Sequence, residues 1–495
     1  MKATQIDKVI SRNYRSMLAS MMMASVVLVT MTTQVKGQDV EALRQLAWSS
    51  VENHSEELIG LSDALWGYAE LAMLETKSAA ELADYLEEQG FTVERGVADM
   101  PTAFVATYGS GSPVVGILAE YDALPGLSYR VDSSPTPLNE GEPGHGCGHN
   151  LFGAASVGAA VAVKDVLRRY RLEGTIVLFG CPAEETVVGK VYMAKAGLFD
   201  GLDVCLDWHP GSSTGVGFSR TRALNNFTVE FFGKTAHGAG DPWNGRSSLD
   251  AIELMNHAVN MLREHVPPST RIHYVIPNGG GAPNVVPGYA KVWYFVRDLY
   301  RPGVESTYAW VLKTAEAAAL ATETTHKVTL TTGVHSYMLN RPLTEMLDRS
   351  LHAAGEPEWS EDDHEFARAI QRELGKPEEG MFEGIKEMPA EEQPASGGST
   401  DVAEVSRIVP TAKLSVAAWP IGSPGHAWPV VACSGRSTGH KAMLFAARVL
   451  GGAAAELMIS PEIIEAAQEE FDRKTEGNPY VSPIPVDQKP PIPPR

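Results

Sequence analysis

Short apolar runs alternate with helical patterns over the first half of the chain. The runs that predict buried strands are residues 114–119, 175–179 and 204–208. The segments that carry apolar residues at helical spacing are residues 41–69, 78–89 and 151–170. Strands that alternate with helices in this way are typical of an α/β domain, with a mostly parallel sheet covered by helices.

A second pattern fills residues 222–337, which we expect to form an inserted domain. Its expected strands are residues 227–232, 272–276, 291–296 and 327–332, and its expected helices are residues 248–265 and 303–321. This order, βαββαβ, is that of a ferredoxin-like sheet with helices on one face. The pattern then becomes helical and mixed again, with a strand at 412–417 and a helix at 441–457. The first domain would therefore comprise residues 38–221 and 338–476.

The two ends of the chain differ in sequence composition from the two expected domains. Arg12 and Arg15 precede a stretch rich in Met, Val and Ala at residues 17–31, and small side chains follow near Gly37. This pattern predicts a signal peptide over residues 1–37 and an exported protein, periplasmic or secreted, with an uncleaved membrane anchor as the alternative. Residues 477–495 are rich in proline, which predicts an extended or disordered tail.

Composition narrows the classes of function. The chain has 495 residues, of which 44% are hydrophobic and 21% charged, enough for more than one core. Lys and Arg total 41 against 61 Asp and Glu, a formal net charge of -20. This charge repels phosphate backbones and anionic lipid, so we expect neither a nucleic-acid partner nor stable membrane insertion. The 4 cysteines are too few to indicate a disulfide framework.

Metal-binding side chains follow the predicted strands of the first domain. A glycine-rich loop places a thiol and an imidazole two residues apart, just before the helix at 151–170. Carboxylates and imidazoles occur in three further segments that follow or end apolar runs. The residues concerned are Cys147, His149, Glu184, Glu185, His209 and His426. Strand ends meet at one edge of an α/β sheet, so this pattern predicts a metal site and a metallohydrolase.

Several blocks together resemble the aminoacylase/carboxypeptidase family of dinuclear-metal amidohydrolases, and more narrowly its aminobenzoyl-glutamate hydrolase-like branch. The blocks are residues 120–126 (EYDALPG), 145–150 (HGCGHN), 182–185 (PAEE), 208–210 (WHP), 279–287 (GGGAPNVVP) and 425–426 (GH). The resemblance implies a phosphorylase/hydrolase-like catalytic domain with a mixed sheet. It also implies that the inserted domain is a lid through which the chain forms a homodimer.

The resemblance assigns two divalent ions, zinc or manganese, to five ligands. A thiolate can bridge two ions, which makes Cys147 the candidate bridge. The other ligands would be His149, Glu185, His209 and His426. The chain departs from the family pattern at Glu120, where many relatives have the histidine of a His-x-Asp motif. That departure leaves the identity of the metal open.

Further roles come from the same resemblance. Glu184 matches the general base, and Asp122 matches the acid that fixes a metal-binding histidine. Adjacent residues at a strand end point in opposite directions, which would let Glu184 and its neighbour do different work. In the inserted domain, His237 matches an oxyanion donor that reaches across the dimer interface. Asn284 matches a residue that touches the substrate amide or carboxylate, and Arg297 matches the clamp of an α-carboxylate.

These residues predict an enzyme that cleaves a small-molecule substrate at the amide between an acyl or aroyl group and an amino acid. A dipeptidase on the same scaffold remains an alternative. A catalytically silent metal-binding protein is another, although a retained Glu184 argues against it. We expect structural roles for the remaining histidines near the motifs and in the helices of the inserted domain, which are His145, His257, His265 and His440.

Overall fold

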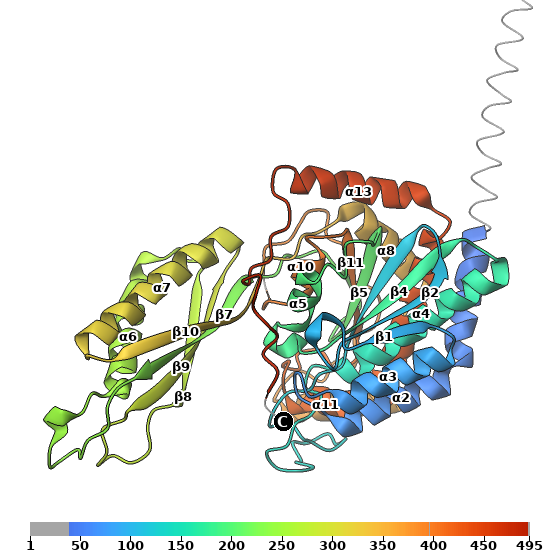
Figure 1. Ribbon diagram of the computed structural model, residues 1–495. Coiled ribbons are helices and arrows are strands. Elements are labelled where there is room, and N and C mark those ends of the chain that lie inside the picture. Colours follow the sequence, from blue (N-terminus) through green and yellow to red (C-terminus); the bar gives the residue numbers. More distant parts are fainter. Residues whose placement is uncertain (1–38, 396, 494–495) are drawn as a thin grey trace, which may run out of the picture.

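A seven-stranded mixed sheet forms the centre of the larger domain in the computed structural model, which describes residues 39–395 and 397–493 (Figure 1). In spatial order the strands are β1 (Thr92–Arg95), β2 (Phe104–Ser110), β4 (Gly174–Cys181), β3 (Val114–Glu120), β5 (Val204–Gly211), β11 (Thr411–Ala417) and β6 (Gly215–Gly217). Strands β4, β3, β5 and β11 are parallel, while β1, β2 and β6 pair antiparallel with their neighbours. The expected signal peptide lies outside the described residues.

Helices bury both faces of the parallel strands, which explains their continuous apolar runs. On β3, Ile117 packs into one buried cluster and Leu118 into another. The helices that share the cluster of Ile117 include α2 (Ser55–Tyr68), α3 (Thr76–Glu88), α4 (His149–Tyr170), α8 (Arg341–Ala354), α11 (Trp428–Ser434), α12 (Ser437–Leu457) and α13 (Pro461–Thr475). Those that share the cluster of Leu118 are α5 (Gly189–Lys195) and α10 (Val402–Val405). Helix α9 (Glu361–Glu373) completes the domain.

The structure differs from the sequence-based expectation in several places. The long helix expected over residues 41–69 is two helices, residues 39–53 and α2, with a turn at His54. Strands β1 and β6 were not anticipated because they are short, lie at the edges of the sheet and carry few buried apolar residues. Strand β2 was not among the expected strands either. It is seven residues long and pairs with β1 on one side and β4 on the other.

Helix α4 lies in the middle of the core. It is long and apolar enough to cross a membrane, as is the bent pair α12 and α13, among the described segments. However, 94% of the most apolar stretch of α4 is buried inside the fold. Its apolar face is therefore used for packing against α12 and the sheet, and its first residue, His149, is positioned at the strand ends.

The inserted domain, called the lid domain below, has a separate four-stranded sheet. Its elements in chain order are β7 (Ala223–Phe232), α6 (Ser248–Leu262), β8 (Arg271–Asn278), β9 (Tyr289–Asp298), α7 (Arg301–Ala321) and β10 (Thr325–Val334). The spatial order is β10-β7-β9-β8, and every pairing is antiparallel. Both helices lie on one face (Figure 1). The α/β fold class and its ferredoxin-like insertion are confirmed.

The proline-rich segment after α13 runs along the boundary between the two domains (Figure 1). Its described residues, 477–493, contain neither helix nor strand. Ile484 is buried in the cluster on the α5 side of the sheet. The side-chain amide of Gln488 donates hydrogen bonds to the Tyr192 hydroxyl on α5 and to the carbonyl of Leu330 on β10. The segment thus joins the larger domain, called the catalytic domain below, to the lid domain.

Candidate metal centre and active-site cavity

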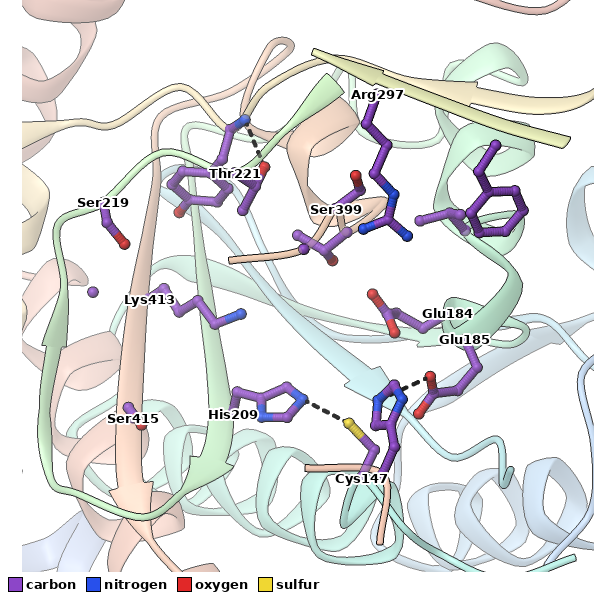
Figure 2. Close-up of a pocket in the computed structure, with 17 residues that line it drawn as sticks. Cys147, Glu184, Glu185, His209, Ser219, Thr221, Arg297, Ser399, Lys413 and Ser415 are labelled. Carbon is purple, nitrogen blue, oxygen red and sulfur yellow. Dashed lines mark hydrogen bonds and ion pairs between the residues drawn. The ribbon is translucent and has the colours of Figure 1, made fainter. Parts of the chain in front are cut away.

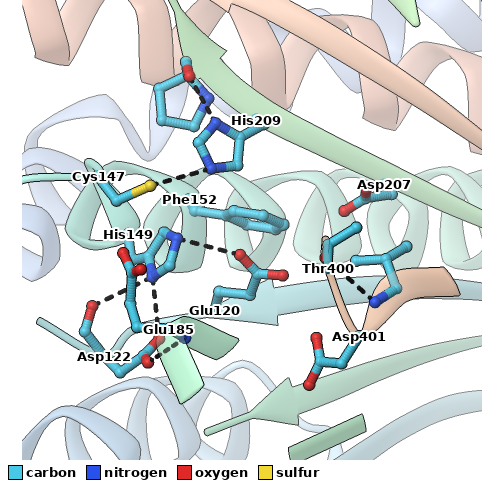
Figure 3. Close-up of polar contacts among 12 residues, drawn as sticks. Glu120, Asp122, Cys147, His149, Phe152, Glu185, Asp207, His209, Thr400 and Asp401 are labelled. Carbon is cyan, nitrogen blue, oxygen red and sulfur yellow. Dashed lines mark hydrogen bonds and ion pairs between the residues drawn. The ribbon is translucent and has the colours of Figure 1, made fainter. Parts of the chain in front are cut away.

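The five predicted metal ligands converge at the carboxyl ends of the parallel strands (Figures 2 and 3). Cys147 lies in the loop after β3, and His149 begins α4. Glu185 follows β4, His209 lies near the end of β5, and His426 lies in the loop after β11. The site is therefore assembled where open α/β sheets place their ligands.

Cys147 belongs to two groups of side chains that could each hold a cation. One group is Cys147, His149 and His209, and the other is Cys147, Glu185 and His426, with the ligand atoms of each group within 4.8 Å of one another. Cys147 Sγ lies 3.4 Å from His209 Nε2. His426 Nε2 lies 3.4 Å from a carboxylate oxygen of Glu185. A thiol common to both groups occupies the position that a bridging ligand requires.

The donor atoms fit divalent cations. His149 Nε2 and Glu185 Oε1 are buried and form no hydrogen bond among the described residues, although a Glu120 oxygen lies 3.2 Å from His149 Nε2. Burial raises the pKa of the Cys147 thiol to about 12 and that of the Glu185 carboxyl to about 7. Buried groups of this kind become anionic ligands only when a cation compensates their charge. Sulfur, imidazole and carboxylate donors together suit zinc and similar divalent ions.

Unusual backbone conformations hold two of the ligand loops. His426 has a positive φ of 53°, which is uncommon for a residue with a side chain. Its N–H donates a hydrogen bond of 3.0 Å to the carbonyl of Gly146, next to Cys147. Gly148, with φ of 77°, separates Cys147 from His149. Glycine adopts this conformation at no steric cost, whereas the strain at His426 is typical of functional sites, where the surrounding structure enforces it.

Asp122 positions two ligands at once. Its Oδ1 accepts a hydrogen bond of 2.9 Å from His149 Nδ1, which leaves Nε2 directed at the cluster (Figure 3). Its Oδ2 accepts a hydrogen bond of 2.9 Å from the backbone N–H of Glu185. The sequence-based role of Asp122, to fix a metal-binding histidine, matches this geometry.

Glu184 and Glu185 lie on a 3₁₀ turn, Glu184–Thr186, and not on a strand. The turn follows Ala183, which has a left-handed backbone with φ of 58°. The alternation expected of strand residues therefore does not apply, but the turn still separates the two side chains. Glu185 belongs to a candidate metal-binding group with Cys147 and His426. Glu184 belongs to a different candidate group, with Glu120 and His149. Burial and the charge of Glu120 raise the pKa of Glu184 well above its usual range.

Glu120, the departure from the family pattern, belongs to a buried ion network. Lys190 Nζ donates hydrogen bonds of 2.7 Å to Glu120 and to Asp401. The other Glu120 oxygen lies 3.2 Å from His149 Nε2. Neither Lys190 nor Asp401 was predicted from the sequence. A lysine inside the apolar segment of α5 was the available signal, but its two partners are distant in sequence.

A cavity of about 560 Å³ opens beside the ligands (Figure 2). The larger domain contributes four of the five predicted metal ligands, all except the buried His149, together with Glu184 and the β11 side chains Lys413 and Ser415. The lid domain contributes Phe295 and Arg297 from β9. In the described part of the chain, Arg297 forms no ion pair, and its buried Nε has no hydrogen-bond partner. Its cationic group is thus available to a ligand in the cavity.

His237 and Asn284 do not line this cavity within the single chain. Both are exposed on loops of the lid domain, where a β-bridge joins His237 to Val285. His237 Nδ1 accepts hydrogen bonds of 3.1 and 3.0 Å from the N–H groups of Ala239 and Gly240. This arrangement places the ring proton on Nε2, the form that an oxyanion donor needs.

The histidines expected to be structural make other contacts. His145 Nε2 contacts the Leu65 carbonyl at 2.9 Å, and burial lowers its pKa to about 4. His440 Nε2 lies 2.8 Å from Asp63. None of the four joins a candidate metal-binding group in the part of the chain that the structure describes.

The α/β domain, its cluster of metal ligands and the ferredoxin-like lid domain together define a metallo-amidohydrolase. Residues 220–321 match the M20 peptidase dimerisation domain. The chain is 37% identical over 467 residues to one of the subunits of the p-aminobenzoyl-glutamate hydrolase of Escherichia coli (strain K12), covering 89% of this chain and 97% of the relative. The chain therefore belongs to the M20 peptidase family, and it is a metal-dependent amidohydrolase that acts with divalent metal ions.

Two further comparisons agree with this assignment. Human Xaa-Arg dipeptidase is 29% identical over 467 residues, which cover 90% of this chain and 96% of the relative. The structure of a Bacillus subtilis protein described as a dinuclear metal-binding peptidase of the M20 family superposes with a TM-score of 0.51 at 17% identity. The superposition covers 82% of this chain and 98% of the other. It shows that the two chains share a fold.

Because Cys147 belongs to two candidate metal-binding groups, its substitution should affect metal binding strongly. Cys147→Ser removes the thiolate from both candidate groups, so we expect a large loss of bound metal and of activity. Cys181→Ser and Cys205→Ser are matched controls, because both thiols are buried away from the cluster, and they should retain metal. Elemental analysis gives the metal content. Bound metal should also protect Cys147 from alkylation, and equal labelling with and without metal would remove Cys147 from the ligand set.

Proposed function

We propose that the enzyme hydrolyses the amide bond between an acyl or aroyl group and an amino acid that carries a free α-carboxylate, with aminobenzoyl-glutamate-like compounds as substrates. The observation that supports this most directly is the cavity itself. Metal ligands and Glu184 form one wall, and the unpaired Arg297 faces them from the lid domain. The name of the Escherichia coli relative, a p-aminobenzoyl-glutamate hydrolase, points to the same bond type.

We assign two divalent ions, zinc or manganese, to the five ligands, with Cys147 as the bridge. Bound there, the ions would polarise the substrate carbonyl and make a water molecule more acidic. The carboxylate of Glu184 accepts the proton of the attacking water and returns it to the nitrogen of the leaving amine. Asp122 keeps the ring of His149 and the backbone of Glu185 in place during this transfer.

Residues of the lid domain orient the substrate in this proposal. The planar guanidinium of Arg297 binds the α-carboxylate through two parallel N–H groups. Asn284 contacts the substrate amide or carboxylate. The Nε2–H of His237 donates to the developing oxyanion. Because His237 and Asn284 lie outside the cavity of their own chain, both would act in the cavity of a second copy, in a homodimer formed through the lid domains.

The similarity to Xaa-Arg dipeptidase supports a second candidate, a dipeptidase that uses the same site. The two functions differ in the group that precedes the scissile amide, an acyl or aroyl group against an aminoacyl group. Turnover of aminobenzoyl-glutamate, N-acyl amino acids and dipeptides by the metal-loaded enzyme, followed as released amine, separates them. We also propose that the protein is exported, on the basis of the N-terminal sequence pattern.

The role of Glu184 is tested by Glu184→Gln. This change keeps the shape of the side chain but removes its capacity to accept a proton, so turnover should fall by roughly a hundredfold or more. Metal content should remain at the wild-type level, because Glu184 belongs to neither of the two candidate groups that contain Cys147 and is only part of a third group with Glu120 and His149. Initial rates are measured beside elemental analysis. Wild-type turnover in Glu184→Gln would exclude the general-base role, and loss of metal would make Glu184 a ligand.

The proposed homodimer is tested by complementation. His237→Ala and Glu184→Gln should each be nearly inactive, but a mixed dimer contains one cavity with both residues intact. Mixing the two variants should therefore restore part of the activity. Size-exclusion chromatography with light scattering establishes the oligomeric state at the assay concentration. An active monomer would contradict a role for His237 in a second copy.

Recognition of the α-carboxylate is tested by Arg297→Lys. Lysine keeps the charge but loses the planar pair of donors, so kcat/KM should fall strongly for substrates with a free α-carboxylate. The same substrates amidated at that carboxylate should be cleaved poorly by both enzymes, with little difference between them. If the wild type cleaves the acid and its amide equally well, the enzyme is a general amidase.

A further inference from the structure

A second cation faces the active-site cavity from the catalytic domain. Lys413 lies on β11, whose alternate residues Ala412, Leu414 and Val416 are buried in the core. Its side chain therefore points to the opposite face of the strand, and Figure 2 shows it extending into the cavity near His209. Partial burial of a lysine on a strand with an apolar opposite face costs desolvation free energy unless an anionic group pairs with its ammonium group.

The charge of Lys413 is only loosely compensated. Its Nζ forms an ion pair with Asp207, a buried carboxylate whose oxygens accept no hydrogen bond among the described residues, but the distance of 3.7 Å is too long for a hydrogen bond. Among the described residues, no hydrogen bond from Lys413 Nζ is formed. The side chain is 28% exposed, so the ammonium group can reach a molecule in the cavity while it remains partly shielded from bulk water.

Lys413 and Arg297 approach the cavity from different domains. Figure 2 shows Arg297 descending from the lid domain and Lys413 extending from β11, with the metal-binding side chains between and below them. Two carboxylates that line the cavity, Glu184 and Glu185, lie on the metal-binding side. One cation is sufficient for an α-carboxylate. The second, which is held only by the long contact with Asp207, is free to bind another anionic group on the substrate.

We propose that Lys413 binds the side-chain carboxylate of the amino-acid half of the substrate, so that the enzyme prefers N-acyl derivatives of acidic amino acids. This inference rests on the proposed function, in which Arg297 holds the α-carboxylate. Ser219 lines the cavity on the same side as Lys413 and offers its hydroxyl group to the second carboxylate oxygen, whereas the Ser415 hydroxyl already donates to the carbonyl of Ser213. A charge-assisted hydrogen bond in a partly shielded site discriminates well against an uncharged analogue.

The experiment compares N-benzoyl-glutamate with N-benzoyl-glutamine, which have nearly the same shape but differ in the charge of the side chain. We expect the wild type to prefer the glutamate compound by about 10- to 100-fold in kcat/KM. Lys413→Met should lower kcat/KM for the glutamate compound by a similar factor and leave the glutamine compound nearly unchanged. Lys413→Arg should retain most of the preference. Lys313→Met, on the exposed face of α7, makes the same change in net charge and should have no effect.

A competing interpretation gives Lys413 a supporting role for His209, its neighbour in the cavity. In that case Lys413→Met would reduce turnover of both compounds equally or lose metal, and either result overturns the proposal. N-benzoyl-leucine separates this failure from failure of the proposed function. If the wild type cleaves the leucine, glutamine and glutamate compounds equally well, only the role of Lys413 is wrong. If it cleaves none of them, the proposed function is wrong.

Binding to the Glu184→Gln variant provides a measurement that does not depend on turnover. N-benzoyl-glutamate should bind this variant more tightly than N-benzoyl-glutamine, by calorimetry. The double variant Glu184→Gln, Lys413→Met should bind the two compounds with similar affinity. Equal affinities already in the single variant would exclude recognition of the side-chain carboxylate in the bound state.

Discussion

The concentration of negative charge at the ends of β3, β4 and β5 is the constraint on which the rest of the structure depends. Glu120, Asp122 and the two adjacent glutamates of the 3₁₀ turn converge there with a thiol, largely away from water. Ionised groups in such a setting repel one another and lose their hydration. Lys190 compensates only part of this charge. The raised pKa values of Cys147, Glu184 and Glu185 mean that protons neutralise these groups when no metal is bound, so metal binding at this site is coupled to the release of protons.

In the proposed function, the two domains divide the work on the substrate. Rigid elements of the catalytic domain hold the metal ligands and the adjacent carboxylates. The lid domain offers a cationic side chain from β9 and, on its exposed loops, a histidine whose tautomer is fixed by backbone N–H groups. The relative position of the domains therefore determines the length of substrate that can bridge the site. Residues 477–493, which contact both α5 and β10, stabilise that relative position.

Much of the fold and of the metal-binding cluster could be predicted from local patterns. The central strands are continuous apolar runs, the helices have regular apolar spacing, and the metal ligands follow strands in compact glycine-containing motifs. The short edge strands β1 and β6 lack that signal. Lys190, Asp401 and Lys413 could not be assigned for a different reason. Their function depends on partners far away in the chain, so it emerges only when parallel strands and α5 are packed together.

The position of β11 has a consequence for biosynthesis. This strand pairs with β5 on one side and β6 on the other, yet it follows the whole lid domain in sequence. Strand β5 ends at Gly211 and β11 begins at Thr411, so one edge of β5 stays unpaired until the segment that follows the whole lid domain has folded against it. An open strand edge of this kind pairs readily with other chains. The candidate group of Cys147, Glu185 and His426 is completed only when the loop after β11 has joined the site.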